Sequence, residues 1–310
     1  CGVIPTPGIA YLTRKYKCDA GVMISASHNS YEYNGIKFFN RDGFKLDDDI
    51  EDAIEDIIVR DIDVNSHITG ERLGRCFKEE EEAKRIYIDH LLETMDGTLE
   101  GYKVVLDCAN GAAYPVAMQV YQELGADVVT IGDQPDGINI NADCGSTHPA
   151  RLQEAVLRHP ADIGLAFDGD ADRLIGVDEK GRIIDGDKLL CICANMMKQQ
   201  NQLQNNLVTA TVMSNVGFLN YIRSIGCDIE ITSFCLGFKY FPVYFISQQK
   251  LFVGSDSVHF SVVQHHNLIC ILYGGNTLRN DYFCGVGKRV FKSLTDQFVR
   301  SGVHGAGGVV

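Results

Sequence analysis

The sequence predicts an α/β fold with mostly parallel sheets, and three observations support this prediction. Short apolar runs alternate with longer amphipathic runs up to about residue 231. The short runs have the length and composition of buried strands, and the longer runs have the apolar spacing of helices. Polar loops rich in carboxylates and hydroxyls directly follow two of the short runs, and in folds of this class ligands bind beyond the carboxyl ends of the strands.

Each element follows from its local pattern. An apolar run predicts the first strand at 20–24. Acidic residues crowd the first turns of the helix expected at 46–58, where the helix dipole favours them. Gly125 ends the helix expected at 112–124, and Asp178–Gly181 form the turn of a hairpin. The other elements are expected as helices at 79–95, 151–157, 187–198 and 216–225, and as strands at 103–106, 128–131, 163–167, 174–177, 182–184, 207–212 and 228–231.

The length of 310 residues suggests about two domains from length alone. Residues 60–80 are polar and lack a clear period, which predicts a linker between domains. A second boundary is expected at 186–188.

The overall charge excludes some classes of function. A net charge of −13 argues against nucleic acid as a partner, because such proteins usually carry a basic patch. No apolar run is long enough to span a membrane, and the first residues do not resemble a secretory leader. We therefore expect a cytoplasmic protein without a membrane partner.

The charge is also unevenly distributed. Residues 232–310 contain seven Lys and Arg, three Asp and no Glu, which gives this segment a net charge of +4. Since the whole chain has a net charge of −13, the preceding 231 residues carry −17. The same final segment holds nine of the 15 Phe residues. Such a change indicates either a separate domain or a segment under different constraints.

The loop Asp168–Arg173 has the sequence Asp-Gly-Asp-Ala-Asp-Arg and directly follows an apolar run. Three carboxylates at this spacing can converge on one hard cation, since Mg²⁺ and Ca²⁺ prefer oxygen ligands. A solvated acidic loop is the alternative, but between two apolar strands it is costly without a cation. A calcium-binding EF-hand fits poorly, because Arg173 occupies the usual glycine position and strands flank the loop. The pattern predicts a metal site at Asp168, Asp170 and Asp172.

A second candidate is the small polar loop Ser25–Asn29, which follows the strand expected at 20–24. Such a loop can expose a hydroxyl nucleophile, and His28 can hydrogen-bond a phosphate or assist proton movement. An ordinary polar turn would have the same composition. Lys37 follows shortly afterwards and could bind phosphate or transfer a proton, although it could equally be a surface residue of an edge strand.

Together these motifs closely resemble the α-D-phosphohexomutase superfamily, and within it the bacterial phosphoglucosamine mutase branch. The resemblance covers residues 2–231, about three quarters of the chain. The motifs that carry it are Ser25–Asn29, Asn34–Lys37, Leu106–Ala113, Asn141–Pro149, Asp168–Arg173 and Thr211–Asn215.

The resemblance implies consecutive α/β domains with mixed or parallel sheets. It also implies interconversion of glucosamine 6-phosphate and glucosamine 1-phosphate, in amino-sugar nucleotide and cell-wall precursor synthesis. Ser27 would carry a phosphate that passes to the sugar, giving a bisphosphate that returns its other phosphate to the serine. One Mg²⁺ would be held by Asp168, Asp170, Asp172 and an oxygen of phosphorylated Ser27, and a sugar 1,6-bisphosphate would act as activator.

The chemistry of the residues agrees with this reading, because phosphoryl transfer depends mainly on positioning and charge neutralisation. Arg173 is expected to stabilise the charge that develops on the transferred group. Lys37 is the candidate general acid or base, supported by His28.

The sequence also departs from the family pattern. Ser30 replaces a proline that follows the family's Ser-His-Asn, which removes some rigidity from the loop. We expect an incomplete first domain, without the family's opening strand, helix and active-site arginine, and no fourth domain. The domains are expected to be a partial first domain with linker at 1–78, a second at 79–186, a degraded sugar-binding third at 187–275, and an unassigned tail at 276–310.

After residue 231 the resemblance fades. Leu236–Tyr240 stand where the family has Gly-Asp-Arg-Tyr, and Gly254–His259 stand where it has a sugar-specificity loop whose Glu is missing here. Lys239, Ser257 and His259 remain the candidate substrate-binding residues. Either this segment is a divergent third domain or it is decayed or misread sequence, and we favour the second.

Two alternatives to the glucosamine activity stay open. One is phosphomannomutase or phosphoglucomutase specificity, since the missing Glu would grip sugar hydroxyls. The other is a catalytically inert fragment that binds Mg²⁺ and little else.

Overall fold

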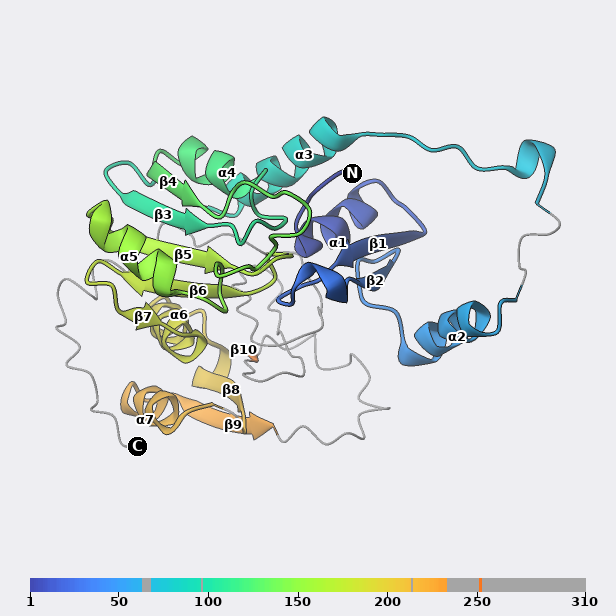
Figure 1. Ribbon diagram of the computed structural model, residues 1–310. Helices are drawn as coiled ribbons and strands as arrows, with labels where there is room; N and C mark the ends of the chain where they lie inside the picture. Colours follow the sequence, from blue (N-terminus) through green and yellow to red (C-terminus); the bar gives the residue numbers. More distant parts are fainter. Residues whose placement is uncertain (63–67, 96, 213, 233–250, 253–310) are drawn as a thin grey trace.

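The computed structural model describes residues 1–62, 68–95, 97–212, 214–232 and 251–252. Within them the chain forms three sheets with helices packed against them, which confirms the expected α/β class (Figure 1).

The largest sheet has five strands in the order β4-β3-β5-β6-β7. The strands β4 (Asp127–Ile131), β3 (Lys103–Asp107) and β5 (Ile163–Phe167) run parallel to one another. The hairpin formed by β6 (Leu174–Asp178) and β7 (Ile183–Ile184) then adds antiparallel pairing to the same sheet. The sheet is therefore mixed, and its three parallel strands bring the loops that follow them to one edge.

Helices cover both faces of this sheet. The helices α3 (Glu80–Glu93) and α4 (Ala117–Glu123) contribute to the core on one face, and α5 (Ala150–Arg158) contributes to a separate core on the other. Strand β3 serves both cores, since Val104 and Leu106 join the first and Val105 joins the second. This two-sided burial explains why the strand is a continuous apolar run without alternation.

The helix α4 is shorter than the sequence predicts. Residues 111–116, expected to be mostly helical, form turns instead, and α4 begins only at Ala117. The amide of Ala112 donates a hydrogen bond to the carbonyl of Gly169, 2.7 Å away. A Cβ on Gly111 would overlap that same carbonyl oxygen. This close contact between two loops fixes the backbone and overrides the local helical preference.

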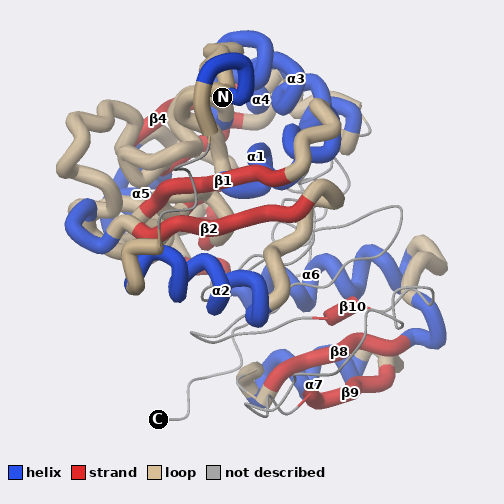
Figure 2. The backbone as a smooth tube through the Cα atoms, turned by 90° about the vertical axis from the view of Figure 1, so that its right-hand side faces the viewer, coloured by secondary structure: helices blue, strands red, loops and turns tan. Residues whose placement is uncertain are grey.

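The N-terminal unit consists of α1 (Thr6–Lys15) and the antiparallel pair β1 (Ala20–Ser25) and β2 (Gly35–Asn40), which lie side by side in Figure 2. Buried Met23 and Phe39 pack with Ala10 of α1 and with Ala112 from the loop after β3. One face of the pair of strands therefore packs against both the helix and the loop after β3, while Val22, Ile24 and Ile36 on the other face are exposed. The sequence pattern did not predict α1, because prolines and a glycine open it.

The helix α2 (Asp48–Val59) has no buried residue, and it leads into the segment expected to be a linker. Residues 68–79 are exposed and contain only the short 3-10 helix η2 (Gly70–Arg72). Figure 1 shows this segment as an extended stretch that leads from η2 to α3.

The third unit begins with α6 (Gly186–Gln199). The parallel strands β8 (Leu207–Thr211) and β9 (Asp228–Thr232) are joined through α7 (Val216–Ser224), and the short 3-10 helix η3 (Gln204–Asn206) precedes β8. A third parallel strand, β10 (Leu251–Phe252), pairs with β8. Two of the helices have side-chain caps: Asp185 accepts from the Lys188 amide and Asn215 from the Phe218 amide.

Apart from the start of α4, the expected elements match the described ones to within about two residues at each end. The sequence pattern does not predict α1, β2, the short strand β10 or the 3-10 helices. No helix in the described part of the chain combines the length and the apolar character that crossing a membrane requires.

Candidate active site at the Asp168–Asp172 loop

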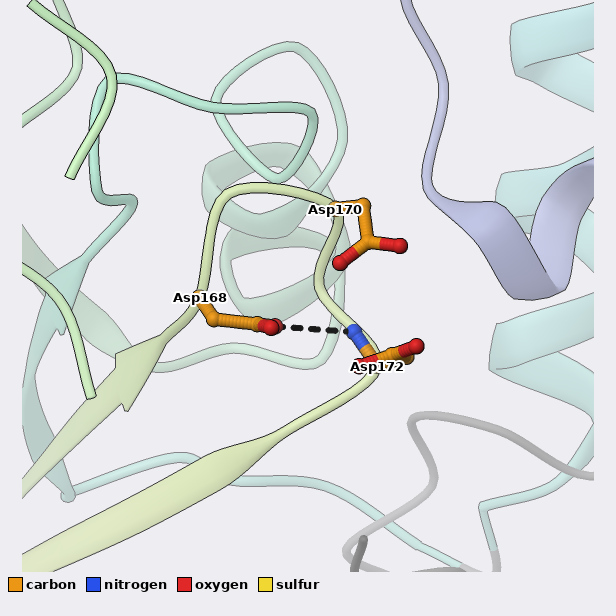
Figure 3. A group of neighbouring side chains, drawn as sticks. All are labelled: Asp168, Asp170 and Asp172. Atoms are coloured by element: carbon orange, nitrogen blue, oxygen red, sulfur yellow. Dashed lines mark hydrogen bonds between the residues drawn. The ribbon is translucent and has the colours of Figure 1, made fainter. Parts of the chain in front are cut away.

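The three aspartates lie on the loop that leaves the end of β5 and returns as β6 (Figure 3). Asp168 and Asp170 are 0 % exposed and Asp172 is 2 % exposed. One carboxylate oxygen from each lies within 4.8 Å of the others. The loop is held in this shape by the amides of Asp172 and Arg173, which donate to Asp168 Oδ1 over 3.1 and 3.0 Å. Backbone geometry therefore gathers the three acids instead of letting them separate into solvent.

Burying three like charges together changes their proton affinities. Burial, followed by the charges of Asp172 and Asp170, raises the pKa of Asp168 well above its ordinary value. Burial and Asp170 likewise raise the pKa of Asp172. Burial would also raise the pKa of Asp170, but the charge of Lys37 and hydrogen bonds from Lys37, Thr6 and Ser27 together outweigh it and leave that pKa lowered. The positive side chains near the cluster therefore do not fully neutralise the three carboxylates.

Lys37 projects from β2 into this cluster. Its Nζ donates to Asp170 Oδ2 over 2.6 Å and to Asp172 Oδ2 over 3.0 Å. Burial would lower the pKa of Lys37, but the two aspartates raise it above its ordinary value. Lys37 is therefore a charged residue of the site and not a surface residue of an edge strand. A second residue from the N-terminal unit, Thr6, donates from its Oγ1 to Asp170 Oδ2 over 2.6 Å.

The donor set fits a hard divalent cation. All three residues offer carboxylate oxygens, and Asp170 Oδ1 is buried without a hydrogen-bond partner among the described residues. A buried carboxylate oxygen without a donor is costly, and oxygen ligands are those that Mg²⁺ prefers.

Ser27 approaches the same cluster from the loop after β1. Its Oγ donates to Asp168 Oδ2 at 3.5 Å, across 141 positions of sequence. Ser27 has a φ of +52°, in the left-handed region that non-glycine residues rarely adopt. The adjacent His28 has a buried Nδ1 without a described partner. Burial, and then the charge of Arg173, lower the pKa of His28, so its imidazole is neutral at pH 7.

Arg173, the last residue of the loop, also lies beside the aspartates. Its Nε lies 3.8 Å from Asp168 Oδ2 and 4.0 Å from Asp172 Oδ1, and its side chain is 11 % exposed. Arg173 also lines a cavity of about 280 Å³ together with Ser146 and Thr147. A guanidinium between buried carboxylates and an open cavity is suited to meeting an anion.

The structure brings together the residues that the sequence indicated at both loops: Ser27, His28, Lys37, Asp168, Asp170, Asp172 and Arg173. The three candidate substrate-binding residues, Lys239, Ser257 and His259, lie outside the described residues.

Sequence reasoning missed two residues that touch this site. Thr6 gave no signal, because a threonine between prolines looks like a turn. Asn141 was part of a motif that carried the family resemblance, but no role was assigned to it. Its side chain donates to the carbonyls of Ser27 and Asn29.

Three family models match consecutive parts of the chain. They are domains I, II and III of the phosphoglucomutase/phosphomannomutase family, matched over residues 1–64, 85–181 and 185–269. The third match runs beyond the point at which we expect the resemblance to fade. It includes the positions of Lys239, Ser257 and His259.

The chain is also similar to curated proteins. It is 54 % identical over 228 residues to a phosphoglucosamine mutase of Thermoanaerobacter sp. (strain X514), a match covering 74 % of the chain and 51 % of that protein. It is 55 % identical over 216 residues to a phosphoglucosamine mutase of Clostridium botulinum (strain 657 / Type Ba4), covering 70 % and 48 %. The chain spans about half the length of these relatives.

Solved structures share the fold at lower identity. A phosphoglucomutase/phosphomannomutase family protein of Burkholderia thailandensis has a TM-score of 0.60 at 24 % identity, covering 75 % of this chain and 50 % of that one. A protein of Thermus thermophilus, described as a putative phosphomannomutase, has a TM-score of 0.59 at 18 % identity, covering 80 % and 56 %.

The close approach of the two loops gives a testable expectation for Gly169. A Cβ there would overlap the Ser27 carbonyl oxygen and lie 2.6 Å from Ile140 Cδ1. Because the Ser27 contact is with backbone, Gly169→Ala is expected to push the loops apart and lower the free energy of unfolding by about 1–3 kcal/mol. Urea denaturation followed by circular dichroism measures this change.

Gly35→Ala is the matched control, since its Cβ would meet only the Ser25 carbonyl, at 3.8 Å. It is expected to cost no more than about 0.5 kcal/mol. If Gly169→Ala and the wild type unfolded at the same urea concentration, the close backbone contact between the two loops would be wrong.

Proposed function

The chain belongs to the phosphoglucomutase/phosphomannomutase family of the α-D-phosphohexomutase superfamily, and from this premise we propose that it acts as a phosphoglucosamine mutase. The proposed reaction interconverts glucosamine 6-phosphate and glucosamine 1-phosphate by intramolecular phosphate transfer. The curated relatives named phosphoglucosamine mutase support this choice of sugar over mannose or glucose. A cytoplasmic location would accompany a role in amino-sugar nucleotide and cell-wall precursor synthesis.

One observation carries the proposal. The hydroxyl of Ser27 meets the carboxylate of Asp168 although 141 positions separate them in sequence. Lys37 and Arg173 bring two positive side chains to the same cluster. A hydroxyl, buried carboxylates and fixed cations at one point are what phosphoryl transfer through a serine requires.

In the proposed cycle Ser27 begins with a phosphate on its Oγ. The bond between phosphorus and Ser27 Oγ breaks as a bond to a sugar hydroxyl oxygen forms. The proton of that hydroxyl passes to a base, and Ser27 Oγ takes up a proton to become a hydroxyl. The resulting bisphosphate turns round, and its other phosphate returns to Ser27 by the reverse exchange of bonds and protons.

The charged side chains divide the remaining tasks. Lys37 is held protonated by its two aspartate partners, which suits it to attract the phosphate. We also assign it as the candidate general acid for the departing Ser27 oxygen. The imidazole of His28 has an Nδ1 without a hydrogen-bond partner among the described residues, which suits a proton acceptor. Arg173, beside the cavity, would stabilise negative charge on the transferred group.

The metal is proposed to be one Mg²⁺. Asp168, Asp170 and Asp172, with an oxygen of the phosphate on Ser27, would hold it. When bound, the ion would neutralise the carboxylates and polarise the phosphate.

The sugar-binding part of the proposal rests on the third domain. Lys239, Ser257 and His259 are proposed to contact the substrate, since the domain III match extends over their positions. A sugar 1,6-bisphosphate is proposed as the activator that first loads Ser27. The domain bounds 1–78, 79–186, 187–275 and 276–310 remain predictions.

Ser27 is expected to accept a phosphoryl group. Incubating the chain with glucose 1,6-bisphosphate and Mg²⁺ should add the mass of one phosphate to the wild type and none to Ser27→Ala, as measured by intact-protein mass spectrometry. Ser30→Ala, which changes an exposed serine of the same loop, is the control and should be modified like the wild type. An adduct on Ser27→Ala would contradict the assignment. No adduct on the wild type would favour the inert alternative.

Metal binding is expected to stabilise the fold. A Mg²⁺ concentration 100 times the dissociation constant should raise the free energy of unfolding by about 2.7 kcal/mol. Thermal denaturation measures the accompanying rise in the midpoint temperature. Asp168→Asn should lose most of that rise without lowering the metal-free midpoint, because it removes one of three clustered charges and keeps an acceptor oxygen.

Glu154→Gln is the control, since it removes an exposed carboxylate on α5 that is 3.9 Å from Arg158. It should respond to Mg²⁺ like the wild type. An undiminished response of Asp168→Asn would place the ion elsewhere.

Sugar selectivity is tested by turnover. Glucosamine 1-phosphate should be converted at least about tenfold more efficiently than glucose 1-phosphate or mannose 1-phosphate, which corresponds to about 1.4 kcal/mol of discrimination. Coupled assays of the three substrates side by side, at equal enzyme concentration, measure the ratio of kcat/KM. A preference for either other sugar would replace glucosamine as the proposed substrate.

A further inference from the structure

Asn141 joins the nucleophile loop to the large sheet. Its Nδ2 donates to the carbonyl of Ser27 over 2.7 Å and to the carbonyl of Asn29 over 2.8 Å. The residue is only 6 % exposed, so these bonds are shielded from water. We propose that Asn141 is a positioning residue, which holds the loop so that the Ser27 hydroxyl faces Asp168. This inference rests on the proposed function for its catalytic meaning, but the contact itself does not.

The loop needs such support because Ser27 is in a left-handed conformation, with φ of +52°. That conformation costs a non-glycine residue of order 1–3 kcal/mol and persists only when the surroundings enforce it. Bonds inside the loop are few: the Ser27 amide donates to Ser25 Oγ over 2.9 Å, and the Asn29 amide to the Ala26 carbonyl over 2.9 Å.

The Ser27 carbonyl itself is fixed by two donors from outside the loop. One is the Asn141 side chain, and the other is the Gly169 amide at 3.1 Å. Gly169 lies between two of the clustered aspartates, so its bond ties the loop to the metal-binding turn. Fixing the carbonyl direction limits rotation of the adjoining peptide, and so sets where the Ser27 side chain points.

Position 141 itself suits an asparagine. Its φ is +57°, a region that Asn, Asp and Gly tolerate better than other residues. The amide supplies two N–H donors, and both are used, whereas its Oδ1 has no described partner. Asn141 therefore acts through donation, which an aspartate of the same shape could not provide.

A second layer holds Asn141 in turn. The amide of Asn141 donates to the carbonyl of Ala109 over 2.8 Å. The buried carboxylate of Asp107, at the end of β3, accepts from the amides of Ala109 and Gly145 over 3.0 and 2.8 Å. The support thus runs from a strand end of the large sheet to the nucleophile loop through hydrogen bonds alone.

The loop also has no proline at position 30 to restrict its backbone. Ser30 has φ of −72°, which lies within the range that proline fixes, so Ser30→Pro is compatible with the observed backbone. A proline at this position would restrict the backbone of the loop through its ring. In the wild-type chain the hydrogen bonds from Asn141 restrict it instead.

The test compares Asn141→Asp and Asn141→Gly with the wild type. Both replacements tolerate the left-handed backbone, and both remove the two donors; the glycine variant does so without adding charge. The rate of amide hydrogen exchange should rise about 10- to 100-fold at residues 26–30. Each lost hydrogen bond should raise the equilibrium constant for local opening of this loop by up to about tenfold. Exchange in β3 and β5 should not change.

Asn139→Asp is the matched control. It lies on the same connection, and its side-chain amide donates to the Gln134 carbonyl over 2.9 Å and not to the carbonyls that Asn141 holds. It should leave exchange at residues 26–30 as in the wild type.

A kinetic measurement separates positioning from general stability. With glucose 1,6-bisphosphate and Mg²⁺, the maximal rate of phosphate transfer to Ser27 should fall about 10- to 100-fold in both Asn141 variants, while the half-saturating bisphosphate concentration stays within about twofold. Adding Ser30→Pro to Asn141→Gly should restore part of the rate and part of the exchange protection.

Three outcomes decide the proposal. Wild-type exchange at residues 26–30 in both Asn141 variants would overturn it. Increased exchange throughout β3 and β5 would also overturn it, because Asn141 would then be a general stability determinant. If the wild type takes up no phosphate while the local exchange change appears, the proposed function fails and the positioning contact stands.

Discussion

The structure depends on the burial of three aspartates at the end of β5. Asp168, Asp170 and Asp172 are almost fully enclosed, and their burial and mutual repulsion raise the proton affinity of two of them. A loop of this charge stays inside only if other parts of the chain supply compensation. That requirement explains why the N-terminal unit packs where it does, since Lys37 and Thr6 both donate to Asp170.

The same requirement links the Ser27 loop to the aspartate cluster. The contact of Ser27 with Asp168, the bond from Gly169 to the Ser27 carbonyl and the two bonds from Asn141 all converge on one short loop. Glycines at 111 and 169 allow this, because a Cβ at either would overlap the backbone of the facing loop. Close backbone approach therefore adds to the apolar contacts that Ile4 and Leu12 at the N-terminal end of the chain make with the core of the large sheet.

The local sequence pattern predicted much of the fold and of the aspartate loop. The features that it did not predict depend on contacts between residues that are distant in sequence. The aspartate loop and the strands around it could be predicted from spacing, because alternate carboxylates between apolar strands are costly to bury unless a cation joins them. The shortened start of α4 could not, since a hydrogen bond to Gly169 decides it. Thr6 and Asn141 were missed for the same reason. Each acts on a residue more than 100 positions away, and nothing near them in sequence marks that partner.

The charge of the site explains how an acidic chain could handle the proposed anionic substrate. Three aspartates against Lys37 and Arg173 leave the cluster with a formal charge of −1, which would repel a phosphate. A divalent cation changes that to +1, while the chain as a whole stays strongly negative. Buried, unshielded charges act over short range more strongly than the screened surface charges around them. The net charge of −13 is therefore no obstacle to the proposed phosphate binding, because the few groups at the end of β5 would set the sign of the charge that a phosphorylated substrate meets.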